Sequence, residues 1–387
     1  MNFVYLDNNA TTRPDDSVVA AMGAVSHEAW GNPSSVHRFG QEARRRVDLA
    51  RASVCRLVGC RDRDLVVTSG GTESANLAIR GSLAAQPDRR TVVTTRIEHS
   101  AVRELAESLG RDGIDVRWVD PDGQGRVHVG QLEEILDACA ESIAVVSVIW
   151  VNNETGVVQP IEAIGDLCRS RGVRFHTDAT QRVGRQPVDM ASLPVDMLSF
   201  AAHKFHGPKG VGGLALAPRV RLRAQIIGGP QERDRRGGTE NAAGIVGMGV
   251  AADRAVEWIA TDGAAKQAAL RDRFERAVVE RCDGAVVMGE GAERSWTTAN
   301  IAFPRLEAEA VLLLLSERGV CASAGAACSS GSLDPSPVIL AMGIPDDVAH
   351  GAVRFSLSRE TTSAEIDEAI EIVAEVEHRL RASFAGS

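Results

Sequence analysis

Between about residues 65 and 215, short apolar runs rich in β-branched residues alternate with stretches whose apolar positions recur at helical spacing. Strands that alternate with helices in this way form a mostly parallel sheet with helices on both faces. The expected strands are LVVTS (65–69), TVVTTR (91–96), VRWV (116–119), IAVVSVIWV (143–151), VRFHTDA (173–179), DMLSFAA (196–202) and GGLALA (212–217). We therefore predict an α/β fold whose larger domain is a doubly wound, mostly parallel sheet.

The pattern changes after residue 250, where long stretches rich in Ala, Arg and Glu indicate a second, smaller α+β domain. The elements predicted there are helices over 251–281, 307–318 and 363–382 and the strands TTANIAF (297–303) and AVRFSLS (352–358). We place the large domain at 15–255 and the small domain at 1–14 and 256–387. Within the small domain, the small-residue segment at about 321–332 is expected to be a mobile loop.

The charge and hydropathy of the 387 residues exclude some classes of function. With 43 basic and 52 acidic residues the net charge is −9, which argues against a general nucleic-acid binder or a polybasic membrane-surface protein. The longest apolar runs, at 143–151 and 310–315, are too short to span a membrane, and the first residues lack an export signal. We expect a cytoplasmic protein whose partner is a small polar molecule or another protein.

The seven cysteines predict neither a disulfide framework nor a zinc site, because their number is odd and no C-x-x-C pair occurs. Cys139 and Cys168 lie in apolar helical patterns, where we expect buried, inert packing. Only Cys328 lies in a chemically suggestive segment.

A possible anion site follows the first predicted strand. In LVVTSGGTESANLAI (65–79), Gly70, Gly71 and Thr72 come directly after the strand and open a helix. Glycines let the backbone approach an anion, and the amides of a helix N-terminus favour negative charge. Thr72 and Glu73 also fit an ordinary helix-capping pattern, and this alternative remains equally open.

Two further predicted strands end in polar side chains. Asp178 ends one of them, where a carboxylate faces the ligand crevice of an open α/β sheet, although it could instead bind a metal or cap a helix. Lys204 follows the next strand, between His203 and His206, and a desolvated lysine there could form a Schiff base; the alternative is a solvated surface lysine. An anion cup, a carboxylate and a lysine at one sheet edge are what pyridoxal phosphate requires.

The ordered motifs of this chain carry a family resemblance over essentially its whole length. They are YLDNNATTRPDD (5–16), GNPSSVHRFG (31–40), TSGGTES (68–74), EHSAV (98–102), VNNETG (151–156), HTDATQ (176–181), AHKFHGPKG (202–210), RRGGTENAA (235–243), GAACSSGSLDPSPVILAMGIP (325–345) and AHGAVRFSLSR (349–359). With them the chain resembles the cysteine desulfurases of the class V aminotransferase group, most closely the nitrogen-fixation type. The fold implied is fold type I of the pyridoxal-phosphate-dependent transferases.

The resemblance implies roles for residues of the cofactor site. Lys204 would carry pyridoxal 5′-phosphate as a Schiff base, Asp178 would pair with its pyridinium nitrogen, and His99 would stack over its ring. Thr239 would reach the phosphate bound by the neighbouring subunit, which makes the active unit a homodimer. The other residues implied to bind the cofactor are Gly71, Thr72 and His203 at the phosphate, Gln181 at the ring oxygen, and Asn153 and Ala201.

The resemblance also implies that Arg354 and Asn153 bind the substrate carboxylate and that Cys328 is the nucleophile. An arginine fork fits a carboxylate through two hydrogen bonds, and a thiolate beside cationic groups is the reactive form of cysteine. From the residues alone, Arg354 would be a surface strand arginine, and Asn153 and Gln181 would be turn-forming or solvent-facing residues.

The implied activity is that of a cysteine desulfurase, which converts L-cysteine to L-alanine and leaves a persulfide on Cys328. The implied partners are L-cysteine, a second copy of the chain, and an iron–sulfur scaffold or another sulfur-acceptor protein, including a nitrogenase-related route. No nucleic acid, membrane or resident metal is expected, although the persulfide of Cys328 could transiently ligate an iron–sulfur cluster. The alternatives are a selenocysteine lyase, another pyridoxal-phosphate sulfur lyase, and a non-catalytic sulfur-transfer scaffold.

This chain departs from the family pattern at two places. Ala201 stands where the family usually has a serine hydroxyl directed toward the phosphate, so one hydrogen bond to a charged group is in question. The cysteine segment reads GAAC where GSAC is usual, and Cys321 adds a thiol seven residues before Cys328.

Overall fold

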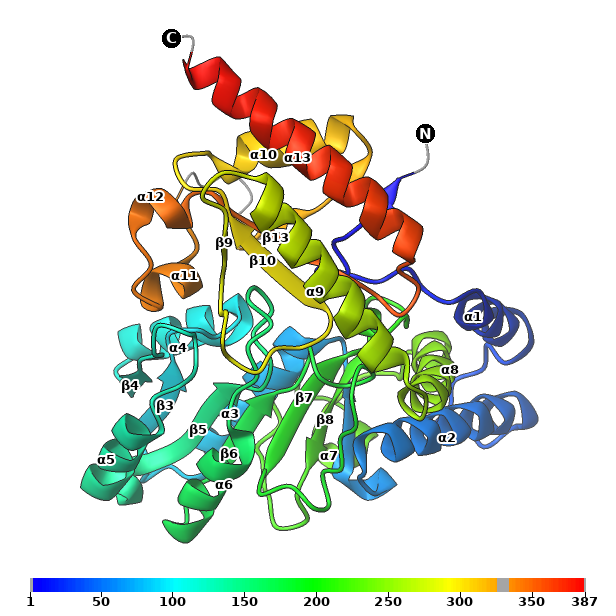
Figure 1. Cartoon of the computed structure of the whole chain (residues 1–387). Coiled ribbons are helices and arrows are strands. Elements are labelled where there is room, and N and C mark those ends of the chain that lie inside the picture. The colour runs from blue at the N-terminus through cyan, green and yellow to red at the C-terminus, as the bar shows by residue number, and fades with distance from the viewer. Residues whose placement is uncertain (1–2, 326–333, 386–387) are drawn as a thin grey trace.

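The structure, a computed structural model, describes residues 3–325 and 334–385. Its larger part is a seven-stranded sheet, drawn in the lower half of Figure 1. The strand order is β2 (Leu65–Thr68), β8 (Gly212–Leu216), β7 (Met197–Ala201), β6 (Phe175–Asp178), β5 (Ile143–Ile149), β3 (Thr91–Thr95) and β4 (Asp115–Val119). β8 is antiparallel to both of its neighbours, and the strands from β7 to β4 are parallel. The prediction of a doubly wound, mostly parallel sheet is confirmed.

Helices cover both faces of this sheet because its strands bury alternate residues on opposite sides. Val92 of β3 packs with α3 (Gly71–Ala85) and α4 (Ser100–Arg111). The next residue, Val93, packs with α5 (Val129–Cys139) and α6 (Ile161–Ser170) on the other face. Six of the seven predicted strands are buried on both sides, whereas the edge strand β4 buries only Val119 fully.

Three further helices pack against one another and share the core that α5 and α6 form with the sheet. α8 (Ala242–Ile259) packs against α1 (Asp16–Glu28) and α2 (Arg38–Val58), as Figure 1 shows at the lower right. Short helical segments occupy the connections: η1 (Asp62–Asp64), η2 (Ala140–Ser142), η3 (Ala202–Lys204) and α7 (Gln231–Asp234). Within 3–325 and 334–385, no helix is both long and apolar enough to cross a membrane.

The C-terminal part is built on a four-stranded antiparallel sheet. Its order is β12 (Ser323–Ala324), β13 (Ala352–Ser356), β10 (Thr298–Ala302) and β9 (Val286–Val287). The helices of this part are α9 (Gly263–Arg281), α10 (Ala308–Glu317), α11 (Pro337–Ala341), α12 (Asp346–Ala349) and α13 (Ser363–Ala385). The N-terminal strand β1 (Val4–Tyr5) joins this part, because it pairs in parallel with β11 (Val320–Cys321) and its Val4 lies in the same core.

Two predictions were wrong in detail. The helix expected over 251–281 is two helices, because Thr261 and its neighbours break the chain between α8 and α9. There the Thr261 hydroxyl donates to the Trp258 carbonyl and accepts from the Gly263 amide. Cys168 is buried as predicted, but Cys139 is only half-buried, because it is the last residue of α5.

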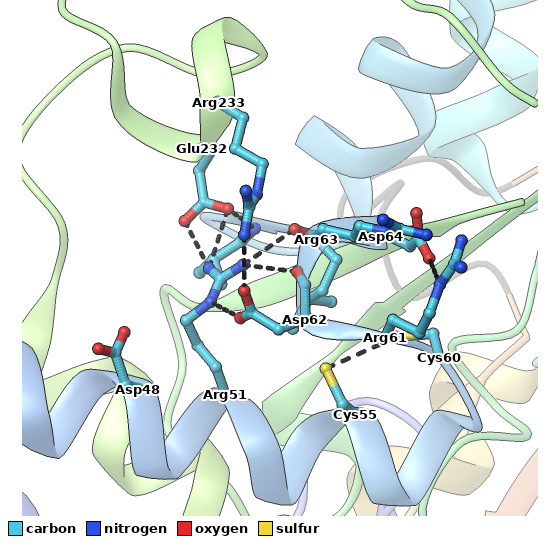
Figure 2. Close-up of polar contacts among 12 residues, drawn as sticks. Asp48, Arg51, Cys55, Cys60, Arg61, Asp62, Arg63, Asp64, Glu232 and Arg233 are labelled. Carbon is cyan, nitrogen blue, oxygen red and sulfur yellow. Dashed lines mark hydrogen bonds and ion pairs between the residues drawn. The ribbon is translucent and has the colours of Figure 1, made fainter. Parts of the chain in front are cut away.

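A buried ion-pair network around Arg51 joins α2 to β2 and α7 (Figure 2). The Arg51 guanidinium donates to both carboxylate oxygens of Glu232 at 2.8 and 2.9 Å and to Asp62 Oδ1 at 2.6 Å. It also donates to the Leu65 carbonyl, and Glu232 accepts from the Val67 amide. All five N–H donors of an arginine suit such a fixed arrangement of oxygens.

This network holds a backbone segment that is strained. Glu232, Arg233 and Asp234 have φ values of 48°, 58° and 62°, in the left-handed region that non-glycine residues seldom adopt. Each such residue costs of order 1 kcal/mol or more, so the segment persists only where its surroundings fix it. The pairing of Glu232 with Arg51 supplies that constraint.

We predict that Arg51→Met lowers the free energy of unfolding by about 3–5 kcal/mol, because it leaves the buried Glu232 carboxylate without its cation. A matched control is Arg45→Met, which removes an exposed arginine that pairs with Glu42 on the same helix. That variant should lose much less stability than Arg51→Met, because an exposed ion pair contributes little. Urea denaturation of the three proteins measures both values, and similar losses in the two variants would contradict the assigned role.

His176 lies in the middle of the large sheet, with hydroxyl groups on both sides. Its Nδ1 is 2.8 Å from Ser147 Oγ on β5, and its Nε2 is 3.1 Å from Ser199 Oγ on β7. Burial lowers the pKa of His176 to about 4, since the charged imidazolium would have to leave water.

Since an unfolded histidine titrates near 6.5, the unfolded state takes up this proton first as the pH falls. We therefore predict that stability decreases between about pH 6.5 and 4, with His176 contributing up to about 3 kcal/mol. In His176→Asn the loss of stability between these pH values should be smaller. Unfolding midpoints of both proteins, measured across this pH range, test the prediction. Parallel curves for the two proteins would refute the assignment to His176.

Candidate active site

One cavity of about 250 Å³ collects most of the residues that the sequence singled out. Nine of the twelve candidate residues line it: Gly71, Thr72, His99, Asn153, Asp178, Gln181, Ala201, His203 and Lys204. A larger cavity, of about 420 Å³, lies beside Tyr5 and Lys209, but neither Lys204 nor Asp178 lines it. The smaller cavity is therefore the candidate active site.

The cavity forms where strands of the large sheet end. Asp178 is the last residue of β6, and Lys204 ends η3, which directly follows β7. His99 caps α4 after β3, with its Nδ1 accepting from the Ala101 amide at 3.1 Å. Because the carboxyl ends of parallel strands meet at one edge, residues far apart in the sequence converge there.

The N-terminus of α3 faces this cavity with little side-chain bulk. Gly70, at φ 155°, precedes the helix, and Gly71 is its first residue. A Cβ on Gly71 would lie 3.1 Å from Thr180 Oγ1 and 3.9 Å from Ala201 Cβ, so the glycine lets Thr180 pack closely against the start of the helix. Glu73 accepts from the Ser69 amide and from Arg236, but the N-cap of α3 is Gly70, which makes no side-chain capping bond, so the full capping pattern left open by the sequence does not form.

The two carboxylates near the sheet edge differ in charge. Burial raises the pKa of Glu98 to about 8, although the Ile149 amide and the Thr95 hydroxyl donate to it. Asp178, whose negative charge also raises this pKa, accepts from the Thr180 amide at 2.9 Å. Glu98 is therefore protonated at neutral pH, and Asp178 provides the negative charge of the cavity.

Lys204 is held by main-chain carbonyl groups of the N-terminal segment. Its Nζ donates to the carbonyl oxygens of Asn9 at 2.5 Å and Ala10 at 2.9 Å. The Asn9 carbonyl also accepts from Gln181 Nε2, and the Asn9 side chain donates to the Asn153 carbonyl. Asn9 thus connects three candidate residues, although no individual role was predicted for it.

Arg185, another residue that sequence reasoning missed, fixes this arrangement. Its guanidinium donates to Asn9 Oδ1 at 2.7 Å, to Gln181 Oε1, to the Asn8 carbonyl at 3.0 Å and to the Lys204 carbonyl at 3.2 Å. These partners are neutral oxygens. Burial lowers the pKa of Arg185 to about 9, so the group remains charged at neutral pH.

Arg354 lies beside the cavity but does not line it. The guanidinium is buried, not at the surface, and it donates to the Asn153 carbonyl at 3.0 Å and to Asp7 Oδ1 at 2.9 Å. Its Nε is buried without a hydrogen-bond partner in the described part of the chain. An unused donor remains beside Asn153.

The remaining candidates lie elsewhere. Thr239 is exposed and is not part of the cavity lining. Cys328 lies outside the described residues. Cys321 is half-buried on β11, where burial and the nearby Asp7 raise the pKa of its thiol.

Comparison with known proteins agrees with this arrangement. Residues 4–369 match the family described as aminotransferase class-V. The cysteine desulfurase NifS of Azotobacter vinelandii is 48% identical over 379 residues, which cover 98% of this chain and 93% of the relative. Among solved structures, a NifS-like protein has a TM-score of 0.89 at 34% identity and covers 97% of this chain and 99% of its own. A structure described as SspA in complex with cysteine has a TM-score of 0.81 at 32% identity, covering 92% and 99%.

We predict that Arg185→Met destabilises the protein, because the oxygens of Asn9 and Gln181 lose their buried donor at about 1–3 kcal/mol each. Arg182→Met is the matched control, since Arg182 lies one turn earlier and stacks on Trp150 at 4.8 Å without contacting Asn9. The Arg182→Met variant should lose less stability than Arg185→Met. Thermal unfolding of both variants measures the difference, and equal midpoints would count against a special role for Arg185.

Proposed function

The chain belongs to the aminotransferase class-V family, and on this basis we propose that it is a pyridoxal-phosphate-dependent cysteine desulfurase. It converts L-cysteine to L-alanine and leaves the sulfur as a persulfide on Cys328. One observation carries the proposal: an amine, a carboxylate and a helix N-terminus converge on one cavity, in a chain that matches cysteine desulfurases over nearly its full length.

The residues of the cavity fit the cofactor. Thr180 and Asn153 line it, and their side-chain atoms Oγ1 and Oδ1 are buried without hydrogen-bond partners in the described structure. Gly71 and Thr72, at the start of α3, also line it, and a helix N-terminus suits a phosphate group. Pyridoxal phosphate, when bound, withdraws electrons from the α-carbon of an amino acid.

The cavity residues divide this work. Lys204 would hold the cofactor's aldehyde carbon and remove the proton from the substrate α-carbon, and Asp178 would keep a proton on the ring nitrogen. Gly71, Thr72 and His203 would hold the phosphate. Burial, with the charge of Lys204 next, lowers the pKa of His203 to about 4, so its ring is neutral at physiological pH.

Gln181 and His99 would hold the cofactor ring. Arg185 can only donate hydrogen bonds, so its contact with Gln181 Oε1 directs the Gln181 amide nitrogen away from itself. Gln181 is then a donor, as the ring oxygen of the cofactor requires. His99 is fixed by its capping bond at the start of α4 and would stack on the ring.

Arg354 and Asn153 would bind the substrate carboxylate. The unpartnered Nε of Arg354 supports this assignment, and Asn153 would donate to the carboxylate through its amide nitrogen. Asp7 holds the other side of the guanidinium at 2.9 Å and so fixes its orientation. A carboxylate that takes two donors of this arginine is bound through charge-assisted hydrogen bonds.

Cys328 would take the sulfur from the substrate. Its thiolate would attack the substrate sulfur, so that an S–S bond forms and the bond between the substrate sulfur and its β-carbon breaks. The electron pair of the broken bond remains with the carbon skeleton, which becomes alanine after protonation. The persulfide on Cys328 is then passed to an acceptor thiol by exchange.

We further propose that the active unit is a homodimer that delivers sulfur to an iron–sulfur scaffold or a similar acceptor protein. Large apolar side chains are exposed around α1 and α2 and near residue 227, as expected of a surface that pairs. They include Trp30, Val36, Phe39, Leu49 and Ile227. The exposure of Thr239 supports a role toward the neighbouring subunit.

Incubation of the purified protein with L-cysteine tests the proposal. We expect stoichiometric alanine and protein-bound persulfide, located at Cys328 by peptide mapping. Lys204→Ala should abolish both products, and Cys328→Ala should bind the cofactor but form no persulfide. Cys321→Ala is the matched control and should stay active.

Some outcomes would overturn the proposal. Borohydride reduction that fixes the cofactor on Lys209, not Lys204, would remove the assigned lysine. Activity with selenocysteine and none with cysteine would indicate a lyase of different specificity. Equal loss of turnover in the two cysteine variants would replace a single nucleophile by a two-cysteine relay.

A further inference from the structure

We propose that Thr180 is a phosphate-binding residue of this chain. Its hydroxyl donates the hydrogen bond that the methyl group of Ala201 cannot donate. This inference rests on the proposed cofactor site and adds a binding residue to it. The sequence assigned Thr180 no role.

The hydroxyl of Thr180 is buried next to Gly71, the first residue of α3. Thr180 Oγ1 has no hydrogen-bond partner among the described residues, and Thr180 lines the cavity together with Ala201 and Gly71. The Cβ position of Gly71 lies 3.1 Å from this oxygen and 3.9 Å from Ala201 Cβ. The hydroxyl and the methyl group therefore face the same residue at the start of α3.

The fold itself does not use this hydroxyl. The Thr180 main chain is already fixed, because its amide donates to Asp178 Oδ1 at 2.9 Å. A buried hydroxyl without a partner is unfavourable, and a valine would fill the same space without that cost. The polar atom is explained by a ligand that accepts its hydrogen bond.

The charges around the hydroxyl favour an anion. The first turn of α3 directs its amides toward the same space, and helix N-termini attract phosphate groups. The carboxylate of Glu73 in that turn is neutralised by Arg236 at 2.9 Å. A phosphate oxygen is a strong acceptor for a hydroxyl, so the bond would be of the stronger, charge-assisted kind.

The test compares two ligands that differ only in the phosphate. We expect Thr180→Val to weaken the binding of pyridoxal 5′-phosphate to the protein by about tenfold or more, measured by equilibrium dialysis. Binding of pyridoxal, which lacks the phosphate, should change less than about twofold. The control is Thr94→Val, because Thr94 on β3 also has a buried, unpartnered hydroxyl but does not line the cavity. It should leave both affinities unchanged.

A second measurement asks whether the two positions substitute for each other. Ala201→Ser in the Thr180→Val background should restore most of the lost affinity for pyridoxal 5′-phosphate. The same Ala201→Ser change in the natural sequence should add much less, because the site is already satisfied. If Thr180→Val does not fold, Thr180→Ser against Thr180→Ala gives the same comparison, with the serine variant binding like the natural protein.

Three results would overturn the inference. Natural affinity in Thr180→Val would show that the hydroxyl makes no bond to the phosphate. Equal losses of affinity for pyridoxal 5′-phosphate and for pyridoxal would show that Thr180 only maintains the shape of the cavity. Equal gains from Ala201→Ser in both backgrounds would show that the two positions act independently. A natural protein that binds neither ligand would instead refute the proposed function, so the two failures can be told apart.

Discussion

The arrangement of the site depends on the buried guanidinium of Arg185. A buried arginine has to donate its hydrogen bonds to protein oxygens in place of water. For Arg185 these oxygens belong to Asn8, Asn9, Gln181 and the main chain of Lys204. No carboxylate neutralises it among these partners, so its charge acts on the cavity as well as on the fold. The group therefore fixes the main chain at Lys204 and sets the direction of the Gln181 amide at the same time.

Much of the large sheet could be predicted from the sequence, because a short continuous apolar run such as residues 91–95 is a local property that indicates a strand buried on both faces. The convergence of Asp178 and Lys204 was also predictable, since both follow parallel strands whose ends share an edge. The contacts of Arg185 and Asn9 were not, because they join segments almost two hundred positions apart and depend on tertiary packing. The break near Thr261 was missed because a single side-chain turn interrupts an otherwise helical composition.

Titratable groups next to the cavity are kept neutral by burial, and this concentrates the charge on a few residues. Glu98, His176 and His203 all have pKa values shifted toward the neutral form. The shifts leave Asp178 as the anion at the sheet edge and Arg185 with Arg354 as cations beside it. Such a distribution of charge suits a reaction that removes a proton from carbon and then has to stabilise the negative charge left on that carbon.

The pairing of the N-terminal segment has a consequence for how the chain is made. The Leu6 amide donates to the Cys321 carbonyl, the Asn8 amide donates to the Ser356 carbonyl, and the next residue, Asn9, holds Lys204. A ribosome delivers residues 6–9 more than three hundred positions before Ser356, while the intervening sheet can already fold. During synthesis this early segment has to wait, without its β partner, until the last strand has left the exit tunnel. The full set of contacts around residues 6–9 is therefore complete only after β13 has been made, so the nascent chain can fold its large sheet before the surroundings of Lys204 are complete.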